Sequence, residues 1–299
     1  MQNFNKILLY IICFLLFQED SVFAQNILAE KLSVEVGSEY RNTDFRWSID
    51  GTVDDRYVNI FSELTFKPIS SAGAFANLQY RVHNLVSAQI SYSHLFTFNG
   101  KVTDYDYDGN DRTNPITQLN LKSNIGGMNH LKLLALFHAV ENAKMNTTIG
   151  LGYGINSEKF YLLDDNNKNL RSTYLAKWYG PQISLDGKMN LIQNWFLRGA
   201  VTAGFLKYAG EGNWNLIEEF QHPVSFVQTA YGLQMDGRLG ILYYFNKNLN
   251  LGIDGIYSYW KTGRGTDKLF LKNGDTPTTG FNSALKKSIG LRLGTKYYF

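Results

Sequence analysis

The chain has 299 residues, of which 44% are hydrophobic and 15% aromatic, and its 29 basic and 26 acidic side chains leave a formal net charge of +3. This mild charge, with lysine and arginine spread among acidic residues, excludes a nucleic-acid-binding protein. The mean hydropathy of −0.23 and the lack of a second long apolar stretch after the N-terminal one exclude a bundle of transmembrane helices.

The N-terminal segment, residues 1–24, has the organisation of a secretory signal peptide. Lys6 precedes an apolar run over residues 7–17, and small residues suited to cleavage stand at the end of the segment. The run is too short for a transmembrane helix. Because the one cysteine, Cys13, lies inside this run, we expect the mature chain, residues 25–299, to fold without disulfides.

From residue 25 onward, apolar and polar residues alternate in segments separated by turn signals, which indicates about ten β-strands. The last segment alternates without interruption up to Phe299. Lipid-facing alternation, together with many Tyr and Phe residues for interfacial girdles, is typical of an outer-membrane barrel. The sequence therefore predicts one all-β domain over residues 25–299, a transmembrane antiparallel up-and-down β-barrel. Its predicted lipid-facing residues include Val34, Leu78, Ile90, Leu151, Leu185, Val201, Leu239, Ile253, Leu291 and Leu293.

The predicted connections alternate in length, as the two sides of such a barrel require, with short turns in the periplasm and long loops outside the cell. Short turns are expected near residues 83–84, 141–144, 191–194 and 246–248. Long extracellular loops are expected over residues 50–55, 99–115, 163–170, 209–223 and 263–282. The strand register is not fixed between residues 118 and 137, because the apolar run there is nearly continuous.

The face opposite the lipid carries charges of both signs. A barrel of about ten strands has a narrow interior that paired charges would mostly fill, which argues against a general diffusion porin. The residues expected there are Glu35, Glu39, Glu63, Asp186, Asp236 and Asp254, with Arg41, Arg81, Lys122, Lys188, Arg198, Arg238, Arg292 and Lys296.

The most acidic stretch of the chain, residues 104–109, reads Asp-Tyr-Asp-Tyr-Asp-Gly in a predicted outer loop. One interpretation is a calcium site formed by Asp104, Asp106 and Asp108, because D-x-D-x-D-G opens an EF-hand loop, although Pro115 replaces the bidentate glutamate of that motif. A second is a catalytic carboxylate pair that activates water. A third is a solvated turn.

Three short stretches give the chain a resemblance to the omptin family of outer-membrane proteases. They are residues 62–67 (Ser-Glu-Leu-Thr-Phe-Lys), 104–107 (Asp-Tyr-Asp-Tyr) and 117–120 (Thr-Gln-Leu-Asn). The C-terminal residues 293–299 are similar too. The resemblance implies a catalytic Asp pair at Asp104 and Asp106, facing an Asp-His pair across the barrel mouth.

The second omptin pair is not intact in this chain. Glu218 stands near the expected aspartate, Phe220 occupies the expected histidine position, and His222 follows two residues later. Since His222 is the one histidine in a predicted outer loop, a protease here would have to use it as the base. The alternative role of His222 is to terminate a turn before Pro223.

Two further stretches, residues 45–49 (Phe-Arg-Trp-Ser-Ile) and 222–226 (His-Pro-Val-Ser-Phe), resemble the Protochlamydia outer membrane protein group. We expect a non-proteolytic surface barrel with a binding or structural role, and keep an omptin-type endopeptidase and a small selective channel as alternatives. No organic cofactor is expected. The expected partners are outer-membrane lipid, lipopolysaccharide, a peptide or glycan at the outer loops, and the barrel-insertion machinery acting on the strand that ends at Phe299. Interfacial girdles, or a binding surface, account for the outer aromatic residues Trp47, Tyr105, Tyr107, Trp214, Phe220, Phe226 and Trp260.

Overall fold

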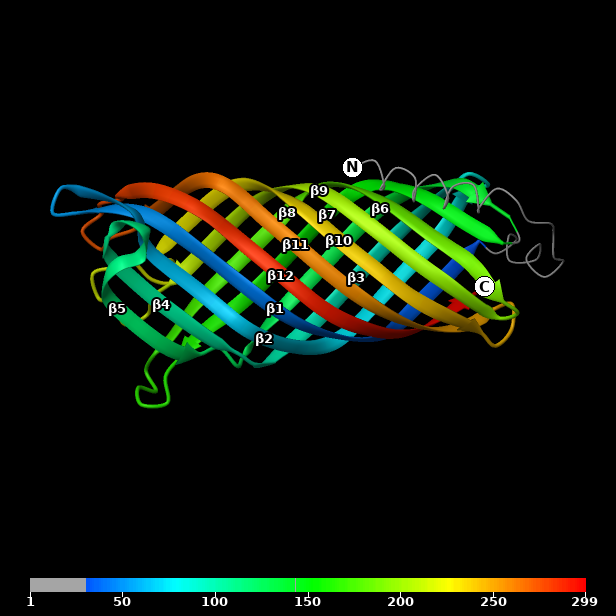
Figure 1. Cartoon of the computed structure of the whole chain (residues 1–299), viewed down its shortest axis with the longest axis horizontal. Coiled ribbons are helices and arrows are strands. Elements are labelled where there is room, and N and C mark those ends of the chain that lie inside the picture. The colour runs from blue at the N-terminus through cyan, green and yellow to red at the C-terminus, as the bar shows by residue number, and fades with distance from the viewer. Residues whose placement is uncertain (1–30, 143) are drawn as a thin grey trace, which may run out of the picture.

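The computed structural model describes residues 31–142 and 144–299, and nearly all of them form antiparallel β-strands (Figure 1). The predicted signal peptide, residues 1–24, lies outside the described residues. No helix in the described part of the chain is long and apolar enough to cross a membrane. The strands are β1 (Leu32–Val53), β2 (Arg56–His83), β3 (Val86–Asn99), β4 (Lys101–Gly109), β5 (Thr113–Lys122), β6 (Gly126–Glu141), β7 (Met145–Leu163), β8 (Arg171–Ile192), β9 (Trp195–Asn213), β10 (Phe226–Tyr244), β11 (Leu249–Leu269) and β12 (Thr278–Tyr298).

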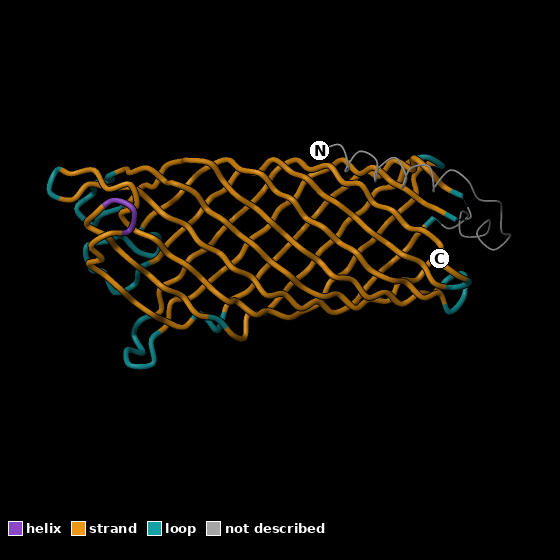
Figure 2. The backbone as a smooth tube through the Cα atoms, viewed as in Figure 1, coloured by secondary structure: helices purple, strands orange, loops and turns teal. Residues whose placement is uncertain are grey.

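Ten of these strands close a ring. The first strand, β1, pairs with its sequence neighbour β2 and also with the last strand, β12. Around the wall the order is β1, β2, β3, β6, β7, β8, β9, β10, β11 and β12, with every contact antiparallel. Figure 2 shows the tilted strands wrapping around the molecule, with the loops gathered at its two ends. The predicted antiparallel barrel of about ten strands is therefore confirmed.

The remaining strands, β4 and β5, form a hairpin that leaves the wall between β3 and β6. A short 3₁₀ helix, Asn110–Arg112, connects them. Strand β4 pairs with the outer part of β2, residues 62–66, beyond the part of β2 that pairs with β3. Near the outer end of the barrel, β4 and β5 therefore occupy the positions that β3 and β6 occupy in the membrane-spanning part of the wall. The loop predicted over residues 99–115 is instead mostly strand, because pairing with β2 satisfies its backbone groups.

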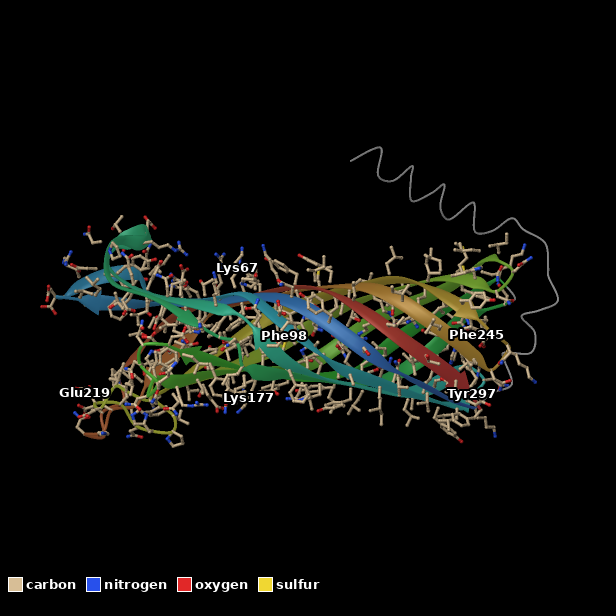
Figure 3. All side chains as sticks on the ribbon, turned by 90° about the horizontal axis from the view of Figure 1, so that it is seen from below. Lys67, Phe98, Lys177, Glu219, Phe245 and Tyr297 are labelled. Carbon is tan, nitrogen blue, oxygen red and sulfur yellow. The ribbon has the colours of Figure 1, made fainter. Side chains whose placement is uncertain are left out.

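The half of the wall that lies toward the periplasmic turns carries the lipid-facing band. Nine to eleven residues suffice for a strand to cross a bilayer, whereas β2 has 28 residues, so the strands continue well beyond the membrane. In Figure 3, Phe98 lies at one end of this band and Phe245 and Tyr297 lie at the other, while Lys67 and Lys177 lie beyond Phe98 toward the end that carries Glu219. The exposed apolar residues of the band include Val36, Leu78, Ile90, Leu151, Leu185, Val201, Leu239, Ile253, Leu291 and Leu293.

Along β1, the apolar face changes from the outside of the barrel to the inside. In the membrane, Val36 and Tyr40 are exposed and point outward, whereas Glu39 is buried in the lumen. Farther out, Phe45 and Trp47 are the buried, inward residues. Side chains of β1 point alternately inward and outward along its whole length. The apolar ones change sides because the outer surface of the wall faces lipid in the membrane and water beyond it. The interior of the outer half can therefore be a hydrophobic core.

Several sequence predictions for the outer half of the barrel are wrong. Trp47, Phe226 and Trp260 lie inside the barrel with at most 6% of their surface exposed, and so belong to no girdle. Glu63 and Lys122, predicted in the lumen, lie near the outer rim in ion pairs with Arg112 and Asp165. The outer loops over 209–223 and 263–282 are shorter than predicted, since β9, β11 and β12 extend into them.

Candidate functional site

The acidic residues singled out in the sequence lie on β4 at the outer end of the barrel. The stretches that carry the omptin resemblance meet here, because β4 lies between the outer part of β2 and β5. Asp104 is paired in register with Leu64 on one side and Leu119 on the other. The three stretches far apart in sequence therefore form one continuous patch of wall.

Asp104 and Asp106 form a pair of carboxylates with different surroundings. Asp104 is buried, with 8% of its surface exposed, and Asp106 is half-buried. Burial, and then the nearby charge of Asp106, raise the pKa of Asp104 to about 7. Within the described residues, neither carboxylate accepts a hydrogen bond or forms an ion pair. Asp104 can thus hold a proton near neutral pH, but no hydrogen bond in the described chain joins it to Asp106, as a shared proton of the catalytic interpretation would require.

The neighbouring acids are neutralised by arginine. Arg56 Nη2 donates to Asp108 Oδ1 at 2.8 Å, and Arg112 Nη2 donates to Glu63 Oε2 at 2.5 Å. One carboxylate oxygen of Asp108 therefore already accepts a hydrogen bond, so only its other oxygen remains for the predicted calcium contact. Among the residues described, no three His, Cys, Asp or Glu side chains converge in a metal-binding arrangement.

The other predicted catalytic residues, Glu218 and His222, lie in the loop between β9 and β10. Both are exposed. The His222 ring contacts its own loop, with Nδ1 2.9 Å from Asn213 Oδ1 and Nε2 3.3 Å from the carbonyl oxygen of Ile217. This loop is fastened to the β11–β12 connection by backbone bonds from Gln221 N to Phe270 O and from Lys272 N to Glu219 O, each 2.9 Å long.

The structure does not bring the two predicted pairs together. In the described chain, no hydrogen bond or ion pair joins Glu218 or His222 to Asp104 or Asp106. Around the ring, β4 stands beside β2, whereas β9 and β10 lie on the other side of β1, β12 and β11. In Figure 3, Glu219 of the β9–β10 loop lies at the lower edge of the outer end, and the β4–β5 hairpin lies at the upper edge.

A packed aromatic core fills the interior of the outer half, between these two edges. Phe45 lies at its centre, with ring centroids 5.3 Å from Phe160 and 6.3 Å from Trp178. Trp47 and Phe226 reach across it with centroids 5.8 Å apart. We call this set the aromatic plug; it comprises Phe45, Trp47, Phe66, Phe160, Tyr174, Trp178, Tyr208, Phe226, Trp260 and Phe281.

Glycines on β9 make room for the plug. A side chain at Gly212 would collide with the ring of Phe226, and one at Gly210 would collide with Tyr174 and Tyr208. Sequence reasoning missed most plug residues. The available signal was the change of apolar face along β1, where Phe45 and Trp47 follow Arg41 on the inward side.

Beneath the plug, the lumen contains the paired charges that the sequence predicted. Arg198 donates to Glu35 at 2.8 Å and to Asp254 at 2.6 Å. Arg292 donates to Glu39 at 2.7 Å. Directly under the plug, Lys286 pairs with Glu158, and both side chains are fully buried. An apolar layer above an ionic layer thus closes the barrel.

These features define the class of protein: an integral β-barrel of the bacterial outer membrane, with a closed lumen and an extended extracellular wall. A model of the family described as Pom, Protochlamydia outer membrane protein, matches residues 34–299, so the chain belongs to this family. The outer-membrane location follows from the family and from the fold. No curated protein matches the chain.

Solved outer-membrane barrels resemble the chain in architecture. OprG from Pseudomonas aeruginosa is 12% identical over 91% of this chain and 96% of its own, with a TM-score of 0.38. The translocator domain of the autotransporter NalP from Neisseria meningitidis is 10% identical over 100% and 96%, with a TM-score of 0.41. The toluene transporter TbuX from Ralstonia pickettii is 6% identical over 91% and 90%, with a TM-score of 0.35. At these TM-scores and identities, the likeness carries no conclusion about this chain.

Proposed function

We propose that this barrel is a non-proteolytic surface protein that binds an extended, basic polypeptide along the free edge of β5. The observation that carries the proposal is that β5 is an edge strand at the extracellular rim. It pairs with β4 on one side, but on the other side its pairing with β7 is limited to Lys122 and Leu163. Figure 1 shows β5 at the margin of the outer wall.

An unpaired strand edge offers backbone N–H and C=O groups to another strand, which can add to the sheet. From Thr113 to Leu121, the described residues include no partner strand on this side of β5. Natural proteins usually protect such edges with lysine or proline. Here Pro115 lies near one end, whereas Ile116 and Leu119 are 61% and 44% exposed. These two apolar side chains suit the side chains of an added strand.

The charge of the hairpin favours a basic ligand. Asp108 and Glu63 already have arginine partners, but Asp104 and Asp106 have none among the described residues. A strand added to β5 would lie two strands from β4, which is about 10 Å. Long lysine and arginine side chains of that strand would bring their charges part of the way across this distance toward the two carboxylates, and release of water from the exposed edge would accompany binding.

The arrangement of His222 supports binding without cleavage. A general base must lie within hydrogen-bond reach of the water that it activates. His222 is held by Asn213 and Ile217 in a loop on the far side of the plug from Asp104. The closed lumen likewise favours a surface role over the channel alternative.

Binding is tested with the refolded barrel and a short fluorescent peptide of alternating valine and lysine, by fluorescence anisotropy. We expect saturable binding that weakens about tenfold or more in the double variant Ile116→Lys/Leu119→Lys, because edge lysines repel the peptide and remove its apolar contacts. A peptide whose backbone is N-methylated at every second residue should fail to bind, since it loses the hydrogen bonds to β5.

The matched control is Leu216→Lys, which changes a similarly exposed residue, 43% exposed, in the β9–β10 loop. It should bind the peptide as the wild type does. Equal binding of the N-methylated peptide would contradict docking on the β5 edge. If mass spectrometry shows that the wild type cuts the peptide and His222→Ala does not, the endopeptidase alternative is correct instead.

Peptide binding should depend on pH through Asp104. Because the pKa of this carboxyl is about 7, it is mostly neutral below pH about 6 and mostly charged above pH about 8. Affinity for the lysine peptide should rise about two- to fivefold across this range, because the buried carboxyl gains one charge at a distance of about two strand spacings from the bound peptide. Asp104→Asn should give a flat profile at the weaker level. A profile as steep in Asp104→Asn as in the wild type would refute the assignment.

A further inference from the structure

A second candidate site lies at the opposite end of the barrel, inside the lumen and open toward the periplasmic turns. A cavity of about 180 Å³ occupies this part of the interior, and a second cavity of about 110 Å³ adjoins it, since both are lined by Asn77, Gln89, Asp186 and Arg238. One water needs roughly 10–15 Å³ of such volume. The larger cavity therefore has room for a small hydrated solute.

The charges that line the larger cavity do not balance. Six basic side chains, Lys31, Arg81, Lys188, Arg198, Arg238 and Lys296, face three carboxylates, Glu35, Glu141 and Asp186. The three arginines use those carboxylates: Arg81 binds Glu141, Arg198 binds Glu35, and Arg238 binds Asp186. Lys31 lies at the exposed entrance. Arg198 also binds Asp254, so the net excess is smaller than this count, and the cationic groups without a carboxylate in contact are Lys188 and Lys296.

Neither of these lysines has a carboxylate partner among the described residues. Lys188 Nζ donates to the hydroxyl of Tyr244 at 2.9 Å and lies 5.3 Å from the ring centroid of Phe196. Lys296 Nζ lies 4.9 Å from the ring centroid of Tyr298. Glu35 attracts Lys296 electrostatically, but its oxygens already accept hydrogen bonds from Arg198 and Asn77.

Further donors of the cavity wall are unused. Arg238 binds Asp186 through Nη2 at 3.1 Å, but its Nε is buried and has no hydrogen-bond partner in the described chain. The Nδ1 atom of His138 is likewise buried without a partner, and it is a donor in the tautomer whose Nε2 accepts from Ser87 Oγ, 2.7 Å away. Buried donors left without partners are costly, so a ligand that accepts from them would be favoured.

We propose that this cavity binds a compact phosphate group that enters from the periplasm, with Lys188, Lys296 and Arg238 as its principal partners. Two ammonium groups that contact no carboxylate suit a phosphate anion, whose oxygens accept hydrogen bonds from lysine and arginine donors. The site is independent of the β5 edge, because the Lys286–Glu158 pair and the aromatic plug lie between them. Either free phosphate or the phosphate group of a small organic ester supplies this chemistry.

The test is isothermal titration of the refolded barrel, in detergent, with inorganic phosphate and in parallel with glycerol phosphate and chloride. Saturable binding of inorganic phosphate is expected, weaker by about tenfold or more in Lys188→Met and in Lys296→Met, because each removes one charge-assisted hydrogen bond. Tighter binding of glycerol phosphate would identify an organic ester as the source. Saturable binding of chloride with equal affinity would overturn the proposal.

The matched control is Lys261→Met, which removes an exposed lysine from the outward face of β11 and should leave phosphate binding unchanged. Heat-modifiable mobility in SDS gels reports whether each variant is folded. If Lys188→Met does not fold, Lys296→Met and Lys296→Arg still decide, since arginine should retain binding and methionine should not. Absence of phosphate binding in the wild type, or wild-type affinity in folded Lys296→Met, would overturn the assignment.

Discussion

A Glu158→Gln barrel is expected to be less stable than the wild type by about 3–5 kcal/mol, because it leaves the ammonium of Lys286 buried without its counter-charge. Both side chains are fully buried directly under the aromatic plug. Lys286 Nζ lies 3.8 Å from the ring centroid of Trp260, and His130 Nε2 lies 3.5 Å from Glu158 Oε1. Urea unfolding in lipid vesicles, followed by tryptophan fluorescence, measures the loss.

Two comparisons show whether the loss comes from the unpaired charge. The double variant Lys286→Met/Glu158→Leu should recover most of the stability, since apolar residues of similar volume replace a buried pair at little cost. In the exposed pair of Lys122 with Asp165, Asp165→Asn should leave the urea midpoint nearly unchanged, because solvent screens this pair. A Glu158→Gln barrel that unfolds at the wild-type urea concentration would contradict the role given to this pair.

The second large effect is expected at Trp178, which is fully buried in the plug. Its ring centroid lies 4.4 Å from that of Tyr208 and 5.7 Å from that of Trp260. Trp178→Ala should destabilise the barrel by about 3–5 kcal/mol through lost burial and the cavity that remains. The same unfolding measurement applies.

Trp195→Ala is the matched control, because Trp195 is 47% exposed on the lipid side, so its removal should cost clearly less. Planar-bilayer recordings add a second measurement. The wild type should carry no single-channel current, since the plug excludes water above the polar cavities. Steady current through the wild type would show that the plug does not close the lumen and would favour the channel alternative.

Alternation was enough to predict the membrane half of the fold. Residues such as Leu291 and Arg292 have opposite character and opposite surroundings, so the pattern identifies both faces. The outer half was misjudged for residues such as Trp260, because alternation does not say which face is inside once lipid no longer surrounds the wall. The pairing of β4 with β2 joins segments about forty residues apart, and local patterns do not encode such contacts.

For the candidate site, the sequence identified Asp104 and Asp106 as neighbours, and the structure places both on β4. The sequence also predicted that Glu218 and His222 lie in an outer loop, and the structure has both in the loop between β9 and β10. The direction of that loop could not be predicted, because it is fixed by hydrogen bonds to Asn213, Ile217 and Phe270. The free edge of β5 was missed, although Leu119 and Leu121 alternate with Gln118, Asn120 and Lys122 as in a strand.

The β4–β5 hairpin replaces β3 and β6 in the wall above the membrane without entering the ring that lipid surrounds. Its length and composition can therefore change during evolution while the part of the barrel that must insert into the bilayer keeps its closure. Sequence changes in the part of the protein that neighbouring cells, phages or antibodies contact therefore need not disturb insertion of the barrel into the membrane.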